Sequence, residues 1–215
     1  MSNNLLVIGA GGHARSVLDI VLQNGVYSKI ACLDSSWPNL KHVEGIEEVP
    51  VIGTDSDMES FYYSGFRHIF IALGNNKLRH KLFRQAVSFG YEPVNIISRY
   101  SIISPRVQIG KGICIMAGAV ININTVIENN CIINTRCSID HDCYIMESCH
   151  IAPGVTLSGY VKVGEGAWIG TGTSVIDKIS IGEWSFVGSG AVVIESLEPN
   201  TLYYGVPAKK IRSVL

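Results

Sequence analysis

The sequence predicts two domains: a small N-terminal α/β domain, followed by a domain of stacked parallel β-coils. Two observations support this fold class. Strands and helices alternate over the first hundred residues, and an aliphatic residue recurs at every sixth position from Ile97 to Val193. Only 16% of the residues are charged. A length of 215 residues is enough for one large domain or two small ones. The expected domains span residues 1–96 and 97–215.

The composition argues against several classes of protein. Hydrophobic residues make up 47% of the chain, so it has ample apolar surface to bury and is not disordered. A net charge of −1 argues against binding to a nucleic-acid backbone. No apolar run approaches the roughly 20 residues of a membrane span, and no signal peptide is recognisable. We therefore expect a cytoplasmic protein without a nucleic-acid or membrane partner. Average soluble domains carry about 25% charged residues, so the low value here suggests a surface buried in an oligomer.

The first domain is expected to alternate strands and helices. Strands are expected at 5–8, 29–34 and 67–73, helices at 14–22 and 77–89, a loop with weak strand content at 35–53, and a connecting segment at 94–97. This alternation is typical of a small parallel α/β domain.

A glycine-rich turn, Gly9-Ala10-Gly11-Gly12-His13, joins the first strand to the first helix. With Ala14 and Asp34 it matches the loose fingerprint of a Rossmann-like nucleotide site. Backbone N–H groups at the helix N-terminus can bind a phosphate, and the acid can accept a hydroxyl hydrogen bond. A tight turn alone would also explain the glycines. Because fewer than 100 residues is short for a full dinucleotide fold, a nucleotide-sugar fits better than NAD, and a nicotinamide-dependent reductase is a weaker alternative.

The second domain is expected to consist of six-residue units. All 17 positions at six-residue intervals from Ile97 to Val193 are aliphatic. Four residues after each of them, from Ser101 to Ala191, only Ser, Val, Ile, Ala, Thr or Cys occurs. The residue directly after the aliphatic one is often a turn former. Three units would form a triangular coil of 18 residues that buries its inner face against its neighbours, and about five coils fit.

Four of the six cysteines occupy the small inward position of this repeat: Cys131, Cys137, Cys143 and Cys149. Their spacing matches no zinc pattern. We therefore expect small, reduced core residues and no metal site.

The repeat resembles the hexapeptide-repeat family, whose fold is a left-handed parallel β-helix. With the glycine-rich turn, the segment Ala72–Asn76 and the ending Gly205–Lys209, the whole chain resembles the sugar acyltransferases of the sialic-acid O-acetyltransferase family. It looks most like UDP-N-acetylbacillosamine N-acetyltransferases. This resemblance implies acetyl transfer from acetyl-CoA to the 4-amino group of a UDP-4-amino-4,6-dideoxy sugar in bacterial glycan biosynthesis. It also implies a homotrimer with active sites between neighbouring β-helices.

The segment Asp140-His141-Asp142 contains the candidate catalytic residues. Acetyl transfer to an amine needs a base, an oxyanion donor and two substrates held close together. Histidine suits the base near neutral pH, and an adjacent carboxylate can fix its tautomer. The residues alone also allow a solvated surface histidine. The resemblance implies that His141 is the base and that Asp142 tunes it, with Asp140 as a turn residue.

The same resemblance implies two sets of binding residues. Acetyl-CoA contacts are expected at His150, Gly159, Thr171 and Ser189, and His150 could also pack at the trimer interface. Nucleotide-sugar contacts are expected at Gly11, Gly12, His13, Asp34, Ser35, Gly74 and Asn75. Close relatives can show two acids where this chain has Asp34-Ser35, so the exact sugar is left open. The other histidines, including His42, His68 and His80, are expected at the surface.

Three other functions stay open at this point. One is O-acetylation of sialic acid or another sugar hydroxyl, and a second is N-acetylation of GDP-perosamine. The third is a trimeric scaffold or nucleotide sensor without enzymatic activity.

Overall fold

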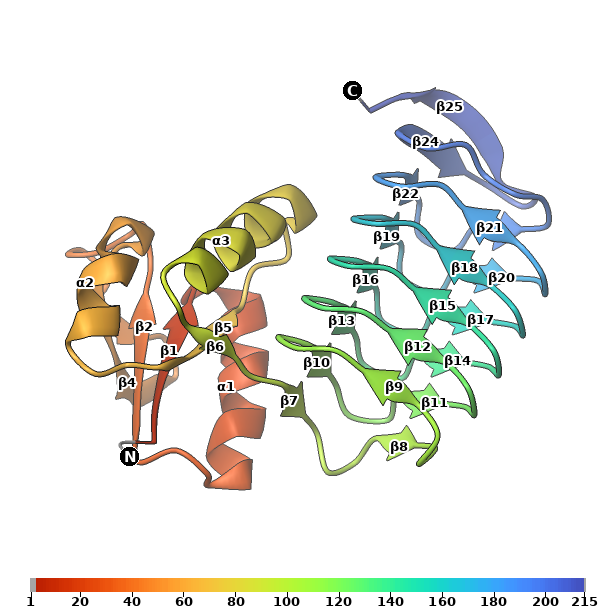
Figure 1. Ribbon diagram of the computed structural model, residues 1–215. Coiled ribbons are helices and arrows are strands. Elements are labelled where there is room, and N and C mark those ends of the chain that lie inside the picture. Colours follow the sequence, from red (N-terminus) through yellow and green to blue (C-terminus); the bar gives the residue numbers. More distant parts are fainter. Residues whose placement is uncertain (1–2, 215) are drawn as a thin grey trace. The chain divides into compact units, whose positions relative to one another are not determined.

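The computed structural model describes residues 3–214 and divides into two compact units, one ending at Ile96 and one starting at Ile97 (Figure 1). The first unit contains a six-stranded sheet in the order β3-β4-β2-β1-β5-β6. Its strands are β1 (Asn4–Ile8), β2 (Lys29–Leu33), β3 (His42–Val43), β4 (Ile46–Gly53), β5 (His68–Ile71) and β6 (Glu92–Pro93). Its helices are α1 (Gly12–Asn24), the 3-10 turn η1 (Asp55–Asp57), α2 (Met58–Tyr63) and α3 (Asn76–Ser88). All neighbouring strands run parallel except β3 and β4.

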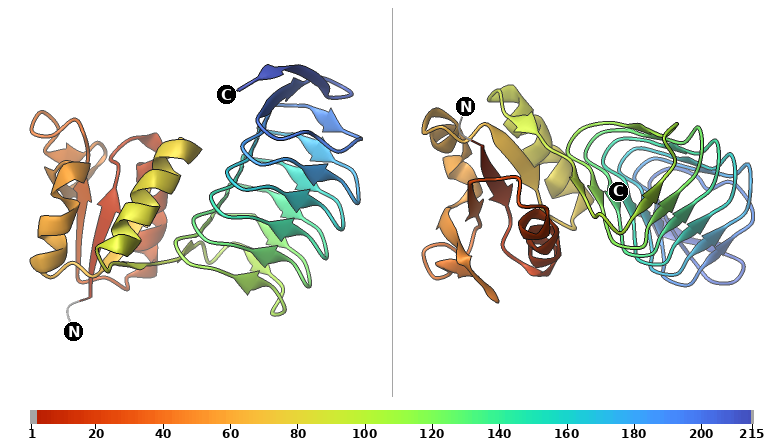
Figure 2. Two further views of the ribbon diagram at one scale, coloured as in Figure 1. Left: turned by 45° about the horizontal axis from the view of Figure 1, so that its top comes forward. Right: turned by 90° about the horizontal axis from the view of Figure 1, so that it is seen from below.

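Helices cover both faces of this sheet (Figure 2). Leu6, Ile8 and Leu33 share one buried cluster with Met58 of α2 and Leu82 of α3, so these two helices cover one face. The opposite face is covered by α1, whose buried residues recur at helical spacing. The central strand β1 is therefore buried from Leu5 to Ile8, as its continuous apolar run predicts.

The segment 35–53, expected as a loop, contains the eight-residue strand β4 and its short partner β3. Only the second half of β4 alternates buried and half-buried side chains, and Pro50 within it normally argues against a strand. The strand forms because it pairs with β2 on one side and β3 on the other. Neither η1 nor the six-residue helix α2 was expected.

The second unit is a left-handed parallel β-helix of short strands on three sheets, with one antiparallel strand added at its C-terminal end. The first sheet holds β7 (Ile96–Ile97), β10 (Cys114–Ile115), β13 (Ile132–Ile133), β16 (His150–Ile151), β19 (Trp168–Ile169), β22 (Phe186–Val187), β24 (Thr201–Tyr204) and β25 (Lys209–Ser213). The second holds β8 (Ile102–Ile103), β11 (Val120–Ile121), β14 (Ser138–Ile139), β17 (Thr156–Leu157), β20 (Ser174–Val175) and β23 (Val192–Val193). The third holds β9 (Gln108–Ile109), β12 (Val126–Ile127), β15 (Tyr144–Ile145), β18 (Lys162–Val163) and β21 (Ser180–Ile181).

The six-residue period sets the register of these sheets. Each of the 17 aliphatic positions ends one two-residue strand, and strands 18 residues apart pair, so that Ile133 lies beside Ile115 and Ile151. The four cysteines of the repeat are buried in the core of the β-helix, as predicted. The core thus consists of one ladder of aliphatic side chains on each of the three sheets, with the small residues packed among them.

The turns between the strands depend on two different positions. Every sixth residue from Gly112 to Gly190 has a positive φ, including Asp142 and Tyr160. The turn former directly after the aliphatic residue, singled out in the sequence, has another function. At Gly164 a Cβ atom would lie 2.5 Å from the backbone nitrogen of Glu183 in the next coil, so glycine is needed there for close stacking.

Candidate functional site

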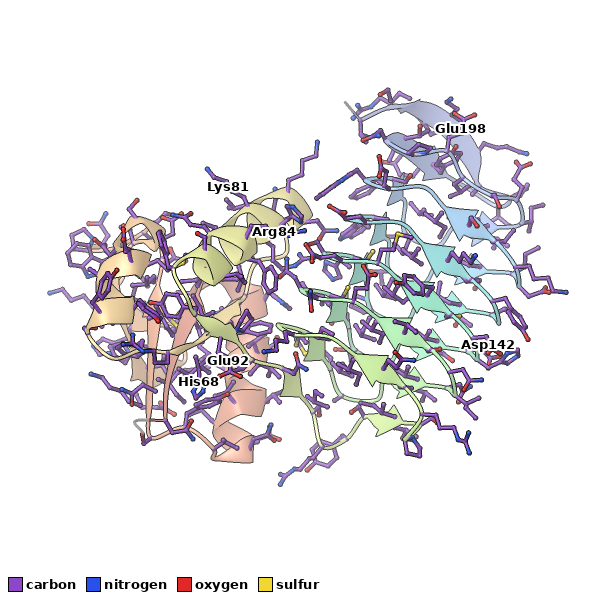
Figure 3. All side chains as sticks on the ribbon, in the orientation of Figure 1. His68, Lys81, Arg84, Glu92, Asp142 and Glu198 are labelled. Atoms are coloured by element: carbon purple, nitrogen blue, oxygen red, sulfur yellow. The ribbon has the colours of Figure 1, made fainter. Side chains whose placement is uncertain are left out.

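His141 lies on a turn that joins the second sheet to the third, between β14 and β15. The chain bends at Asp142, which has a φ of 58° and stands at an outer corner of the coil (Figure 3). Aspartate tolerates this left-handed conformation better than most residues. The turn therefore places an imidazole and a carboxylate side by side on the outside of the β-helix.

The hydrogen bonds of His141 fix its tautomer. Its Nδ1 lies 2.8 Å from Oδ2 of Asp142, and its backbone N–H donates to Oδ1 of Asp140. A carboxylate only accepts, so Nδ1 carries the proton and Nε2 of the neutral ring keeps its lone pair. The side chain is 45% exposed. Nε2 is therefore available as a proton acceptor.

Asparagines of the coil below support the two flanking acids. Asn124 donates to Oδ1 of Asp142 at 3.1 Å, and Asn122 donates to Oδ1 of Asp140 at 2.9 Å. The pKa of the Asp142 carboxyl is lowered, first by the hydrogen bond from His141 and then by the one from Asn124. The pKa of Asp140 is also lowered, with the bond from Asn122 as the largest cause. Both acids are thus ionised at neutral pH.

The coil above provides two neighbours of the imidazole. Gly159 lies against the ring so closely that a Cβ atom there would be 2.6 Å from Cε1 and 2.8 Å from Nε2. The ring of Tyr160 meets the imidazole edge to face, with centroids 5.3 Å apart. Gly159, expected only as a CoA contact, therefore also leaves the space that the ring of His141 occupies.

The other expected CoA residues lie elsewhere on the β-helix. Thr171 and Ser189 are exposed and stack in successive coils on the turns from the first sheet to the second. His150 begins β16 on the first sheet and is only 8% exposed. Its Nε2 lies 3.1 Å from Nδ2 of Asn134, and its ring packs edge-on against Trp168. Within one chain these residues and His141 therefore lie at different places around the triangular cross-section of the β-helix.

The glycines of the glycine-rich turn are of two kinds: one is required by the fold, and two leave open backbone at the surface. Gly9 has a φ of 108°, and a Cβ atom there would touch the carbonyl of Ala72, so the fold itself requires this glycine. Gly11 is the N-cap of α1 and has no positive φ, and nothing lies within 4 Å of its missing Cβ. Gly12 is as open, with only the Arg15 side chain nearby. A tight turn therefore explains Gly9 but not Gly11 or Gly12.

The other expected nucleotide-sugar residues lie near the carboxyl ends of the strands. Both oxygens of Asp34 accept backbone hydrogen bonds, from Ala10 at 2.8 Å and Ser36 at 2.9 Å, so Asp34 ties the glycine-rich turn to the end of β2. Asn75 caps α3 by accepting from the N–H of Leu78. The flanking residues Ser35 and Gly74 are exposed.

His13 lies in the first turn of α1 and is half-buried. Burial, and to a smaller extent the positive charge of Arg79, lower its pKa to about 4, so the ring is neutral at pH 7. Arg79 is 1% exposed and donates to the carbonyl of Leu73 and to Asn76. The expectations for the remaining histidines hold only in part, because His42 is exposed whereas His68 and His80 are half-buried.

A slot at this edge of the sheet adds a residue that the sequence did not indicate. It is lined by Ile8, Gly9, Leu33, Asp34, Ser35, Asp55, Leu73, Leu78 and Leu82. Asp55 lies in η1, shortly after the strand β4. Because the sequence did not predict this strand, it did not place Asp55 near the carboxyl end of a strand.

Among residues 3–214 no group of His, Cys, Asp and Glu side chains is arranged to hold a metal ion. None of the helices described is long and apolar enough to cross a membrane.

Two family profiles match the chain. The PglD N-terminal domain matches residues 4–86, and the bacterial transferase hexapeptide matches residues 124–159 and 160–195. Among curated proteins, the uncharacterised protein L142 of Acanthamoeba polyphaga mimivirus is 36% identical over 106 residues. That match covers 49% of this chain and only 20% of the viral protein.

Solved structures match over almost the whole chain. PerB from Caulobacter crescentus, in complex with CoA and GDP-perosamine, is 37% identical, with 97% of both chains covered and a TM-score of 0.90. The acetyltransferase domain of PglB from Neisseria gonorrhoeae is 34% identical, with 98% of this chain and 100% of that chain covered and a TM-score of 0.92. The same domain has also been solved with acetyl coenzyme A.

Proposed function

The chain belongs to the PglD-like family of hexapeptide-repeat sugar N-acetyltransferases, and from this premise we propose which atoms do the chemistry. It is an acetyl-CoA-dependent acetyltransferase. Its proposed acceptor is the 4-amino group of a nucleotide-linked 4-amino-4,6-dideoxy sugar, and His141 is the proposed base. The observation that supports His141 as the base is its hydrogen bond from Nδ1 to Asp142, which leaves the lone pair on Nε2 of a side chain that is 45% exposed.

In the proposed step the amine nitrogen attacks the thioester carbonyl carbon. The new C–N bond forms, the C–S bond breaks, and the nitrogen loses one proton to Nε2 of His141. The imidazolium then gives this proton to the departing CoA sulfur, so the products are the acetamide and free CoA. The ionised Asp142 holds the ring in the required tautomer and stabilises the imidazolium that forms.

We also propose that the functional unit is a homotrimer. His141 and Gly159 lie on turns from the second sheet to the third, whereas Thr171 and Ser189 lie on turns from the first to the second. Acetyl-CoA that contacts both sets would have to lie between two copies of the β-helix. The exposed Tyr160 and Ile176 on the outer surface of the β-helix would find apolar partners in such an assembly.

The acceptor nucleotide is proposed to bind to the first unit. Gly11 and Gly12 provide open backbone at the N-terminus of α1, where a diphosphate finds N–H donors and a favourable helix dipole. His13, Asp34, Ser35, Gly74 and Asn75 surround this position in the proposal. The resemblance in sequence favours a UDP-linked sugar of the bacillosamine type, and the similarity to the PerB complex favours GDP-perosamine as the alternative.

Replacement of His141 tests the role of the base. We expect His141→Ala to lower kcat by about 10² to 10⁴-fold, because general-base catalysis by a positioned side chain contributes this much. The assay follows CoA release from acetyl-CoA by chromatography, with the amino-sugar nucleotide as acceptor. His42→Ala is the matched control, because His42 is an exposed histidine on β3. Near-normal turnover of the His141 variant would remove this residue as the base.

A further inference from the structure

We propose that the acceptor nucleotide carries guanine and that Asp55 selects this base by accepting hydrogen bonds from its N1–H and N2–H groups. The inference rests on the proposed function, because it names the nucleotide of the same acceptor. It starts from the slot at the carboxyl ends of β1 and β2, which lies wholly within the first unit.

The walls of the slot suit a flat ring. Ile8 and Leu33 belong to the buried cluster on the face of the sheet that α2 and α3 cover, and Leu78 and Leu82 belong to α3. The slot encloses about 90 Å³, far below the roughly 300 Å³ at which sites for whole drug-sized ligands begin. It therefore fits one ring system with its edge inserted, and not a complete nucleotide.

The position of the slot relates it to the phosphate-binding turn. Gly9, Asp34 and Ser35 line the slot, and Gly9 begins the turn that leads to the open glycines at the N-terminus of α1. In parallel α/β domains ligands bind at this edge of the sheet, outside the carboxyl ends of the strands. A nucleotide with its diphosphate on the turn would therefore direct its base toward the slot.

Three carboxylates lie near this edge, and two of them already have structural roles. Asp34 uses both oxygens to accept backbone N–H groups. Asp57 accepts from the N–H and the hydroxyl of Thr54, at 2.8 Å and 3.0 Å, and so caps η1. Asp55 lines the slot, and within residues 3–214 no hydrogen bond joins its carboxylate to another side chain or backbone group. Asp55 is the acceptor that remains for a ligand.

A carboxylate discriminates between the bases because it only accepts hydrogen bonds. Guanine presents two adjacent donors, N1–H and N2–H, which match the two oxygens of a carboxylate and give a charge-assisted pair of bonds. Uracil presents one donor between two carbonyl oxygens, which a carboxylate repels. Adenine and cytosine each present an amino group beside a ring nitrogen that also accepts. An apolar slot with a single carboxylate thus favours guanine over the other three bases.

Calorimetric titration with GDP, IDP and UDP tests the proposal on the full chain. IDP lacks only the N2 amino group, so the comparison with GDP isolates one of the two hydrogen bonds without any mutation. We expect GDP to bind about ten- to a hundredfold more tightly than UDP, with IDP between them, since a hydrogen bond to a charged group is worth this much.

Replacement of Asp55 by the isosteric amide tests the residue itself. Asp55→Asn should reduce GDP affinity at least about tenfold and remove most of the difference between GDP and IDP, and it should raise UDP affinity because the amide no longer repels the uracil carbonyl oxygens. Glu59→Gln is the matched control, since it removes one negative charge from an exposed position on the adjacent α2. It should leave all three affinities unchanged.

The outcomes test the identity of the nucleobase separately from the acetyl-transfer reaction. Equal or tighter binding of UDP overturns the guanine assignment and leaves acetyl transfer to a UDP-linked amino sugar intact. A GDP preference that survives in Asp55→Asn overturns the role of Asp55. Failure of all three nucleotides to bind to folded protein would overturn both this inference and the proposal of a nucleotide-linked acceptor.

Discussion

A methyl group at position 159 should disable catalysis without unfolding the protein. An ideal Cβ on Gly159 would lie 2.6 Å from Cε1 of His141, whereas carbon atoms in contact rest about 3.5 Å apart. The imidazole must therefore retreat by about 0.9 Å. A misplacement of about 1 Å in a reacting group costs on the order of 10²-fold in rate. We expect Gly159→Ala to lower kcat by about this factor.

The assay must distinguish a displaced base from a blocked CoA site. If Gly159 only lined the path of CoA, alanine would raise the KM for acetyl-CoA and leave kcat unchanged at saturation. If Gly159 makes room for His141, kcat falls at saturating acetyl-CoA. Steady-state kinetics over a range of acetyl-CoA concentrations separate the two cases.

The fold should tolerate this substitution. Gly159 has no positive φ, and the ring that it touches belongs to an exposed turn that can move outward. The free energy of unfolding should therefore change by no more than about 0.5 kcal/mol. Thr156→Ala, on the exposed face of β17 in the same coil, is the control for both measurements. A Gly159→Ala enzyme with wild-type kcat would refute the account of the imidazole.

Two other predictions concern buried titratable groups. The pKa of His13 falls from its ordinary value near 6.5 to about 4 on folding, so the unfolded chain binds more protons between these values. Stability should drop by up to about 3 kcal/mol as the pH falls from 7 to 4, and urea denaturation should show a smaller drop for His13→Gln. Burial also raises the pKa of the Cys32 and Cys137 thiols to about 12 and that of Cys143 to about 11. A thiol reagent at pH 8 should thus react with all six cysteines only after denaturation, and rapid modification of the folded protein would contradict this burial.

The β-helix could be predicted closely because the sequence that forms it is periodic. An aliphatic residue at every sixth position determines both the strand and its partner 18 residues away. The α/β unit was harder, since β4 owes its existence to pairing with β2 and not to its own pattern of Glu47, Glu48 and Pro50. Short elements of this kind depend on tertiary contacts more than on propensity.

The candidate site could be predicted only in part, because some of its contacts join residues that are far apart in the sequence. The two acids beside His141 are visible in the sequence, and the structure joins one of them to Nδ1. The contact with Gly159 crosses one coil, and the repeat of 18 residues would have located it, since 141 and 159 differ by one full coil. Asp55 could not be found, because it follows a strand that the sequence did not reveal.

Analysis of the reaction products is the most direct test of acetyl transfer to a nucleotide-linked amino sugar. The protein would be incubated with acetyl-CoA and, in parallel, a UDP-linked 4-amino-4,6-dideoxy sugar, GDP-perosamine and free sialic acid. Chromatography with mass spectrometry would then detect CoA and the acetylated acceptor. We expect an N-acetylated nucleotide-sugar formed in equal amount to CoA, and from the proposed preference for guanine we expect faster turnover with GDP-perosamine than with the UDP-linked sugar. Acetylation of sialic acid alone, or no turnover of any acceptor by folded protein, would contradict the proposed function.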